Sequence, residues 1–285
     1  MADSLDFSGQ NLRNRSFRRR DLSGANFTNA DIRGCDFRQA CLVGANFAGV
    51  RAGCTPMQAI VPWGIAIAIA FLSIQAVLDS GFGGVGKTPG DRGWSFVVAL
   101  LVTLSLAGMG AGLKALVYGR LGWIAGAISG IASGAFLGFY YAGIAAEKDP
   151  QIAVVGAVLG GVLMIPAIWK FGDRVWMQLF VAVAGAIFAY GFALLIGVRA
   201  LAYANVGEVA NAAIFGLACL LYLGFTLESG AFAVRLLTTS PGTSFAKADL
   251  TDARFDGAKL DRTDFSQAKG VSEAMDNGQL TIDNG

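Results

Sequence analysis

The chain has 285 residues, of which 54% are hydrophobic and 15% are charged, and its formal net charge is +2. A soluble protein seldom has this composition, and the hydrophobic excess falls between residues 57 and 237. The chain has no histidine, which excludes histidine acid–base catalysis, Ser-His and Cys-His nucleophiles, and most imidazole-bound zinc or haem. The four cysteines show no C-x-x-C spacing. We therefore expect no enzyme activity, no metal and no cofactor.

Residues 5–47 carry a large apolar residue at every fifth position, and the later units place a small residue two positions before it. Side chains two apart on an extended chain point to the same side, so each unit supplies one apolar pair. A period of five does not fit an amphipathic helix but fits short strands joined by corners. The small residues are Ala25, Ala30, Cys35, Ala40 and Ala45. The apolar centres, which we predict to be buried, are Phe7, Leu12, Phe17, Leu22, Phe27, Ile32, Phe37, Leu42 and Phe47.

The same pattern returns near the C-terminus, with centres at Phe245, Leu250, Phe255, Leu260 and Phe265. Both segments resemble the pentapeptide-repeat family, A-(N/D)-(L/F)-x-x, whose members coil as a square β-helix with four repeats per turn. Repeats at both ends of a hydrophobic chain resemble the multi-pass membrane pentapeptide-repeat proteins common in cyanobacteria. This resemblance implies a thylakoid or plasma membrane location.

Neither repeat segment has enough units to bury its own faces, because solenoids need stacked neighbours. We predict that the two segments stack into one β-helix of about three and a half turns, with the hydrophobic region inserted between them. If Ala52 is the tenth unit, Phe245 is the eleventh, and phenylalanine stacks on phenylalanine. The net charges of +3 for residues 1–55 and −3 for residues 236–285 should favour this docking.

The early repeats depart from the family pattern, because Gln10, Arg15 and Arg20 occupy positions where a small inward residue is expected. A buried, unpaired arginine is costly, so the first turn should be splayed, capped or paired with acidic groups. A compact basic cluster is formed by Arg15, Arg18, Arg19 and Arg20. It is either a solvated cap or a docking patch for an acidic partner or anionic lipid headgroups. Nucleic acid is not expected, because no aromatic platform accompanies the cluster.

Six apolar runs are long enough to cross a bilayer, near residues 57–78, 94–113, 121–145, 152–169, 175–198 and 209–227. The chain should therefore comprise repeats at 1–55, a six-helix transmembrane domain at 56–237, repeats at 238–270 and a tail at 271–285. Of the 22 Lys and Arg residues, 18 fall on the side that holds both termini. The positive-inside rule then places both termini in the cytoplasm.

The third run repeats glycine at every fourth position, which gives a small-xxx-small face, or glycine zipper. This face predicts packing within the chain, an oligomer interface, or a groove for a flat lipid or pigment. Its residues are Gly122, Gly126, Gly130, Gly134 and Gly138.

Residues 81–88, GFGGVGKT, match the phosphate-binding pattern G-x-x-x-x-G-K-[ST]. That chemistry needs a preceding strand and a following helix, whereas here an apolar run precedes the motif and Pro89 follows it. We therefore expect a loop and no bound nucleotide.

The pattern favours a non-enzymatic membrane scaffold or assembly protein that presents a cytoplasmic β-helix to a protein partner or forms a homo-oligomer. From the resemblance, a photosynthetic or bioenergetic membrane complex is a candidate partner. The alternative is a small-solute channel or transporter with the repeats as a regulatory cap. The near absence of ionisable groups within the runs disfavours a channel.

Overall fold

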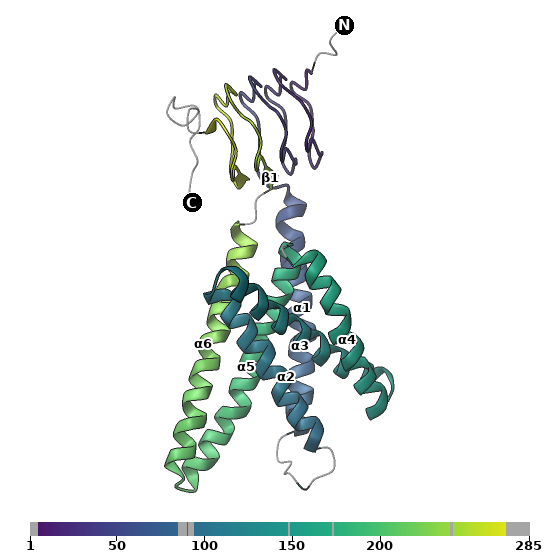
Figure 1. Ribbon diagram of the computed structural model, residues 1–285, viewed down its shortest axis with the longest axis vertical. Coiled ribbons are helices and arrows are strands. Elements are labelled where there is room, and N and C mark those ends of the chain that lie inside the picture. The colour runs from purple at the N-terminus through teal and green to yellow at the C-terminus, as the bar shows by residue number, and fades with distance from the viewer. Residues whose placement is uncertain are drawn as a thin grey trace. The chain divides into compact units, whose positions relative to one another are not determined.

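The computed structural model describes residues 5–84, 90, 94–147, 149–172, 174–239 and 242–271, without the side chains of residues 81–84. It divides into two compact units, which are Met1–Val61 with Thr239–Gly285, and Pro62–Thr238. The first holds both repeat segments and the second holds most of the six helices (Figure 1). Each unit is described by itself below.

The repeats form a coil in which residues 20 apart pair in parallel, as in Asp6 with Asn26 and Asn26 with Asn46. Four five-residue units therefore make one coil. The first coil is residues 5–24, the second 25–44, the third 45–54 with 243–252, and the fourth 253–269. Only β1 (Thr243–Ser244) and β2 (Thr263–Asp264) are continuous strands among the described residues, and the remaining pairings are isolated bridges.

The units turn their corners in a similar way. Except in the unit of Ala52, the second residue after the apolar centre is left-handed, as at Asn14 with φ of 60° and Gly34 with φ of 75°. Where the residue before the centre is Asn or Asp, it accepts a hydrogen bond from the backbone two positions on, as when Arg38 N donates to Asp36 Oδ1 at 3.0 Å. Asn and Asp favour both roles, since their short side chains cap such turns and tolerate the left-handed region. The A-(N/D)-(L/F) pattern follows from this local chemistry.

The N-terminal and C-terminal repeat segments meet within the coil. Phe37 N donates to Ser244 O at 2.8 Å, and Ala52 N donates to Lys259 O at 2.8 Å. Phe245 therefore lies four units after Phe37, which leaves Ala52 as the tenth unit. The predicted stacking of the C-terminal repeats on the N-terminal ones, and its register, agree with these hydrogen bonds.

The phenylalanines line two facing columns in the interior of the coil. Within a column the rings stack with centroids 4.8–5.2 Å apart, and between columns they meet edge to face. Each such aromatic pair contributes roughly 0.5–1.5 kcal/mol beyond its buried area. Because Phe37 stacks on Phe245 and Phe47 on Phe255, the columns continue across the junction between segments. The two columns are Phe7, Phe27, Phe47 and Phe255, and Phe17, Phe37, Phe245 and Phe265.

The described residues of the C-terminal segment do not carry the net negative charge on which the predicted electrostatic attraction was based. The described C-terminal residues 242–271 have five basic and five acidic side chains. The acidic excess counted for the segment comes from Glu273, Asp276 and Asp283, which lie outside the described residues. Backbone hydrogen bonds and ring stacking therefore hold this junction.

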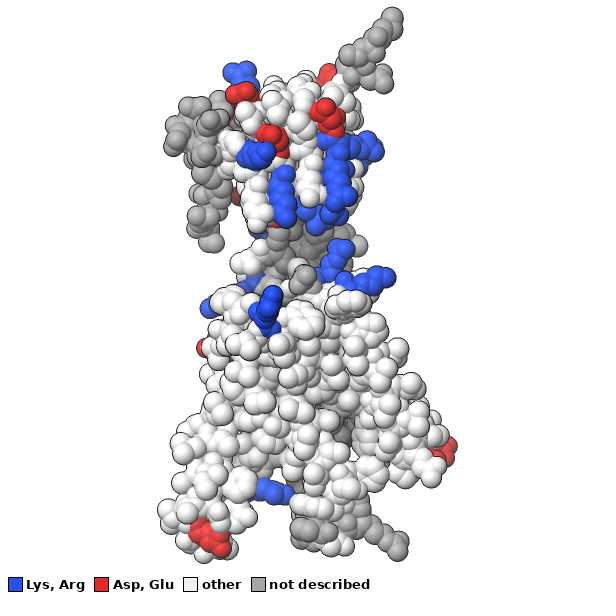
Figure 2. All heavy atoms as spheres, in the orientation of Figure 1, with Lys and Arg blue, Asp and Glu red and all other residues white. Residues whose placement is uncertain are grey.

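Six helices are long and apolar enough to cross a membrane. They are α1 (Pro56–Gly84), α2 (Trp94–Leu116), α3 (Gly119–Ala145), α4 (Pro150–Phe171), α5 (Val175–Asn205) and α6 (Val209–Thr239). The six predicted runs are confirmed; α5 continues beyond the predicted end at 198, and α6 extends to Thr239, close to the predicted end of the transmembrane domain at 237. Figure 2 shows that the visible face of the bundle carries few charged side chains between its ends.

The third helix, α3, packs against α2, α4 and α5. Its contact with α4 is backbone on backbone, because a Cβ on Gly138 would lie 2.2 Å from Gly156 O and one on Gly160 would lie 2.2 Å from Gly134 O. Only glycine permits this approach. On the other side, the Ser129 hydroxyl is buried and donates to Ala107 O of α2 at 2.7 Å.

Candidate binding surface of the repeat coil

The net charge of the coil is concentrated in its first turn. Residues 5–24 contain five arginines and two aspartates, which gives +3. The second and third coils each contain equal numbers of basic and acidic residues, and the fourth, with Lys269, carries +1. Basic side chains gather on one part of the coil surface in Figure 2. The first turn is thus the most basic part of the coil.

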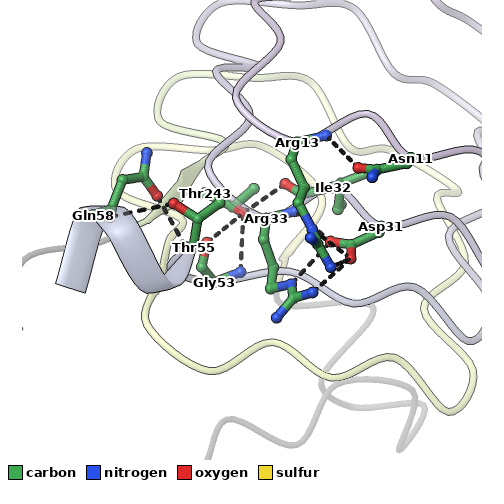
Figure 3. Close-up of polar contacts among 9 residues, drawn as sticks. All are labelled: Asn11, Arg13, Asp31, Ile32, Arg33, Gly53, Thr55, Gln58 and Thr243. Atoms are coloured by element: carbon green, nitrogen blue, oxygen red, sulfur yellow. Dashed lines mark hydrogen bonds and ion pairs between the residues drawn. The ribbon is translucent and has the colours of Figure 1, made fainter. Parts of the chain in front are cut away.

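Three arginines of the first two coils form ion pairs with two aspartates, so one of the three positive charges remains uncompensated. Arg13 and Arg33 both reach Asp31 Oδ2, at 2.6 and 2.7 Å, and Arg38 reaches Asp36 Oδ2 at 2.7 Å (Figure 3 shows the first two). The hydrogen bond from the Arg33 side chain, aided by that from Arg13, holds the pKa of Asp31 well below its usual range. The Arg38 side chain likewise lowers the pKa of Asp36.

The predicted docking residues Arg15, Arg18, Arg19 and Arg20, here called the basic patch, are all exposed. None of them takes part in the three ion pairs of the described residues. Arg19 Nε donates to the neutral amide of Gln39 at 2.8 Å, which orients the guanidinium without cancelling its charge. The positive charge of the patch therefore remains available to another molecule.

The first turn is not splayed, which corrects one of the expectations for Gln10, Arg15 and Arg20. Asn11, Ser16 and Asp21 keep their parallel bridges to the second coil. The three long side chains are exposed, so no guanidinium enters the interior and the expected desolvation cost does not arise. The apolar centres beside them are still buried, and these are Leu12, Phe17 and Leu22.

The outer edge of the first coil is an open strand edge. Across the described part of the chain, the backbone N–H groups of Asn11, Ser16 and Asp21 make no hydrogen bond to a further coil. Open edges invite pairing with another chain, and charged side chains beside them limit self-association. Arginine on this edge opposes pairing with a second copy of the same basic end.

The glycine face of α3 is occupied by atoms of the same chain. A Cβ on Gly122 would lie 2.0 Å from Val117 O, one on Gly126 2.6 Å from Lys114 Cδ, and one on Gly130 2.8 Å from Ile168 Cδ1. Gly134 and Gly138 face α4 as described above. Of the three interpretations, packing within the chain agrees with these contacts.

Cys35 has a structural role, as its small inward position predicts. It is buried, and its thiol donates to Leu12 O at 3.0 Å. Burial raises the pKa of this thiol to about 12, which leaves it protonated and unreactive at neutral pH. The phosphate-loop match at 81–88 lies outside the described residues, apart from the backbone of 81–84. In the described residues no group of three Cys, Asp or Glu could hold a metal ion.

Two polar features of the bundle are absent from the sequence analysis. Tyr140 of α3 donates to Asp79 of α1, and Tyr141 OH donates to Leu72 O of α1 at 3.0 Å. Arg199 of α5 lines an apolar groove. Sequence reasoning missed them because Asp79 comes one residue after the predicted run 57–78 and Arg199 one residue after the run 175–198. Both residues were therefore assigned to loops and not to helices.

A family model for pentapeptide repeats matches the chain in eight copies, over residues 5–39 and 241–269. No similar curated protein and no similar solved structure was found. The second range covers the C-terminal segment of the coil, and the first covers the N-terminal segment up to residue 39, while the coil itself continues to residue 54. Pentapeptide repeats are therefore present in both segments.

Proposed function

We propose that this protein is a non-enzymatic, membrane-anchored scaffold whose repeat coil, a square β-helix, presents the basic patch to an acidic surface of a protein partner. The observation that carries the proposal is the placement of charge. Of the net charge of +4 over residues 5–54 and 243–269, +3 lies on the first turn, and the four arginines of the patch are exposed and outside the ion pairs.

The chemistry of the patch favours a carboxylate-rich protein surface. Guanidinium groups bind carboxylates in a planar, bidentate manner, and four of them lie within residues 15–20. The open strand edge beside them offers backbone groups to an extended segment. Nucleic acid is disfavoured because the phenylalanines of the coil face its interior and supply no stacking surface.

The bundle suits an anchor better than a channel. Its interior is filled by buried side chains such as Leu104, Phe136 and Phe188, and the backbones of α3 and α4 approach closely at Gly138 and Gly160. The alternative of a small-solute channel with a regulatory cap requires a polar path, which these contacts do not favour.

We further propose a thylakoid or plasma membrane location with both termini in the cytoplasm. The excess of Lys and Arg on one side of the six spans supports the orientation. The resemblance to cyanobacterial membrane pentapeptide-repeat proteins supports the membrane, and a photosynthetic or bioenergetic complex is then a candidate partner.

The test uses the full chain purified from its native membrane in mild detergent, with identification of the proteins that co-migrate. The fourfold variant R15Q/R18Q/R19Q/R20Q should lose a stoichiometric partner that the unaltered protein retains. Glutamine suits position 19 because Gln39 and Gln267 already adopt the same left-handed conformation. Added salt should weaken the wild-type complex, because exposed charges are screened.

A matched control removes four exposed charges elsewhere on the coil, as R51Q/K247Q/R254Q/K259Q. This control should retain the partner. Equal retention by both variants, or equal loss from both, would contradict a role for the basic patch. A lone homo-oligomer with a continuous polar pore would instead support the channel.

A further inference from the structure

The second structural unit contains a groove that is apolar except at one end. It has a volume of about 310 Å³ and lies between α2, α5 and α6. Such a volume is within the usual range for small-molecule sites, and bundles often form them between helices. Its walls include Leu101 and Val102 of α2, Phe192 and Ile196 of α5, and Phe215 of α6. Arg199 of α5 is the charged residue of the lining.

Arg199 lacks a partner within the described part of the chain. All three ion pairs there join residues between 13 and 38, and no hydrogen bond involves its side chain. Glu208, the nearest acidic residue along the chain, accepts a hydrogen bond from the Asn211 amide instead. An ionisable side chain in a membrane-spanning helix normally pairs with a group of opposite charge, and no described residue supplies one here, so a negative group of another molecule can bind Arg199.

The rest of the groove has no unmet hydrogen-bonding need. The Ser105 hydroxyl, which also lies in the lining, is 2.6 Å from Tyr222 OH. The ligand must therefore bring one anionic group for Arg199 and an apolar part for the walls.

The position of Arg199 along α5 matches the depth of a lipid headgroup. The helix has 31 residues, so it is about 46 Å long, and Arg199 lies about 9 Å before its end. With hydrocarbon about 30 Å thick, a centred helix places Arg199 near the edge of the hydrocarbon and Phe192 near the middle. One turn beyond, Tyr203 stacks on Phe215 with centroids 5.4 Å apart, an aromatic pair typical of the interface.

We infer that this groove is a binding site for an anionic glycerophospholipid, with the phosphate on Arg199 and one acyl chain along Ile196 and Phe192. Arginine binds phosphate oxygens in a bidentate manner. The acyl chain covers walls that would otherwise be exposed.

The test is native mass spectrometry of the detergent-purified full chain with added phosphatidylglycerol or phosphatidylcholine. The protein should retain one phosphatidylglycerol under conditions that remove phosphatidylcholine. Arg199→Gln should reduce the singly bound population about tenfold. Val102→Trp, at a half-exposed wall position, should reduce it as well, although the charge remains.

The matched control is Arg120→Gln, which removes an exposed arginine of α3 that is not in the groove and should leave binding within about twofold. All variants are compared at unchanged melting temperature. Equal retention by Arg199→Gln, equal retention of phosphatidylcholine, or equal loss from Arg120→Gln would each overturn the site. Loss from Arg199→Gln without loss from Val102→Trp would overturn the placement of the acyl chain.

Discussion

The coil and the bundle use apolar residues for different purposes. In the coil, each buried centre has a fixed neighbour 20 residues away, because backbone hydrogen bonds between coils set the register. In the bundle, lipid is as apolar as leucine, so apolar surface alone does not choose a neighbouring helix. That choice is made where glycine lets backbones meet, as between α3 and α4. In the coil, every unit helps to determine which residues pair. In the bundle, a few glycine positions determine which helices pack together.

Replacing Gly138 by leucine should have the largest effect and should disrupt the bundle. The new Cβ would overlap Gly156 O, so α3 and α4 must separate. The expected loss is more than about 3 kcal/mol, measured as a lower melting temperature and loss of the monodisperse peak in detergent. Hydrogen exchange of peptides from residues 5–54 should be unchanged.

The matched control for this change is Gly216→Leu on α6, where an added Cβ meets no atom within 4 Å. This variant adds the same volume without a clash and should melt close to the unaltered protein. If both variants melt alike, close packing of α3 on α4 does not determine the stability of the bundle.

Phe245→Ala should break the coil and leave the bundle intact. The ring is fully buried, stacked between Phe37 and Phe265, and truncation of such a ring costs about 3–5 kcal/mol. Hydrogen exchange should accelerate in peptides from residues 25–54, which are 190 or more positions away in sequence. Phe7→Ala, at the half-exposed end of the other column, should have a clearly smaller effect. Similar effects of the two variants would argue against one continuous core.

Much of the coil was predictable because its period is tied to local chemistry. The fivefold spacing, the Asn and Asp residues before most centres and the alternation of Phe with aliphatic residues together predict the register across the inserted transmembrane domain. The exposed Arg15 and Arg20 were harder to place, because an inward position at the end of a stack is open to solvent. Less of the bundle was predictable, since hydropathy locates helices but not the helices that they contact. A hydropathy-based span also ends at the first charged residue, so Asp79 and Arg199 were placed outside the predicted helices.

Thr243→Val tests the seam, which is the junction of Thr243 with Gly53 and Ile32 where the C-terminal repeats join the N-terminal repeats. The buried Thr243 hydroxyl accepts from Gly53 N at 2.9 Å and lies 2.9 Å from Ile32 O (Figure 3). Valine has nearly the same shape but leaves the buried Gly53 N–H without a partner, which costs about 1–3 kcal/mol. Hydrogen exchange of residues 45–54 should report the loss. Thr28→Val, at a position that solvent reaches, should change exchange much less, and equal effects would exclude the seam as the cause.

Asp31→Asn should have the smallest effect and the most specific pH dependence. Its pKa is lowered in the folded coil by the Arg33 side chain, so its ionised form stabilises the fold above the unfolded pKa of about 3.9. Removing the charge should cost about 1 kcal/mol at pH 7, seen as faster exchange of residues 5–44. As the pH falls below about 4 the unaltered protein loses this contribution too, so the difference between the two proteins should shrink. Comparing the two proteins at the same pH cancels the intrinsic exchange rate.

Asp256→Asn, an exposed aspartate outside the three ion pairs, is the control and should show no such dependence. A difference between Asp31→Asn and the unaltered protein that stays constant from pH 7 to pH 2.5 would show that the ion pairs of Asp31 contribute nothing through charge.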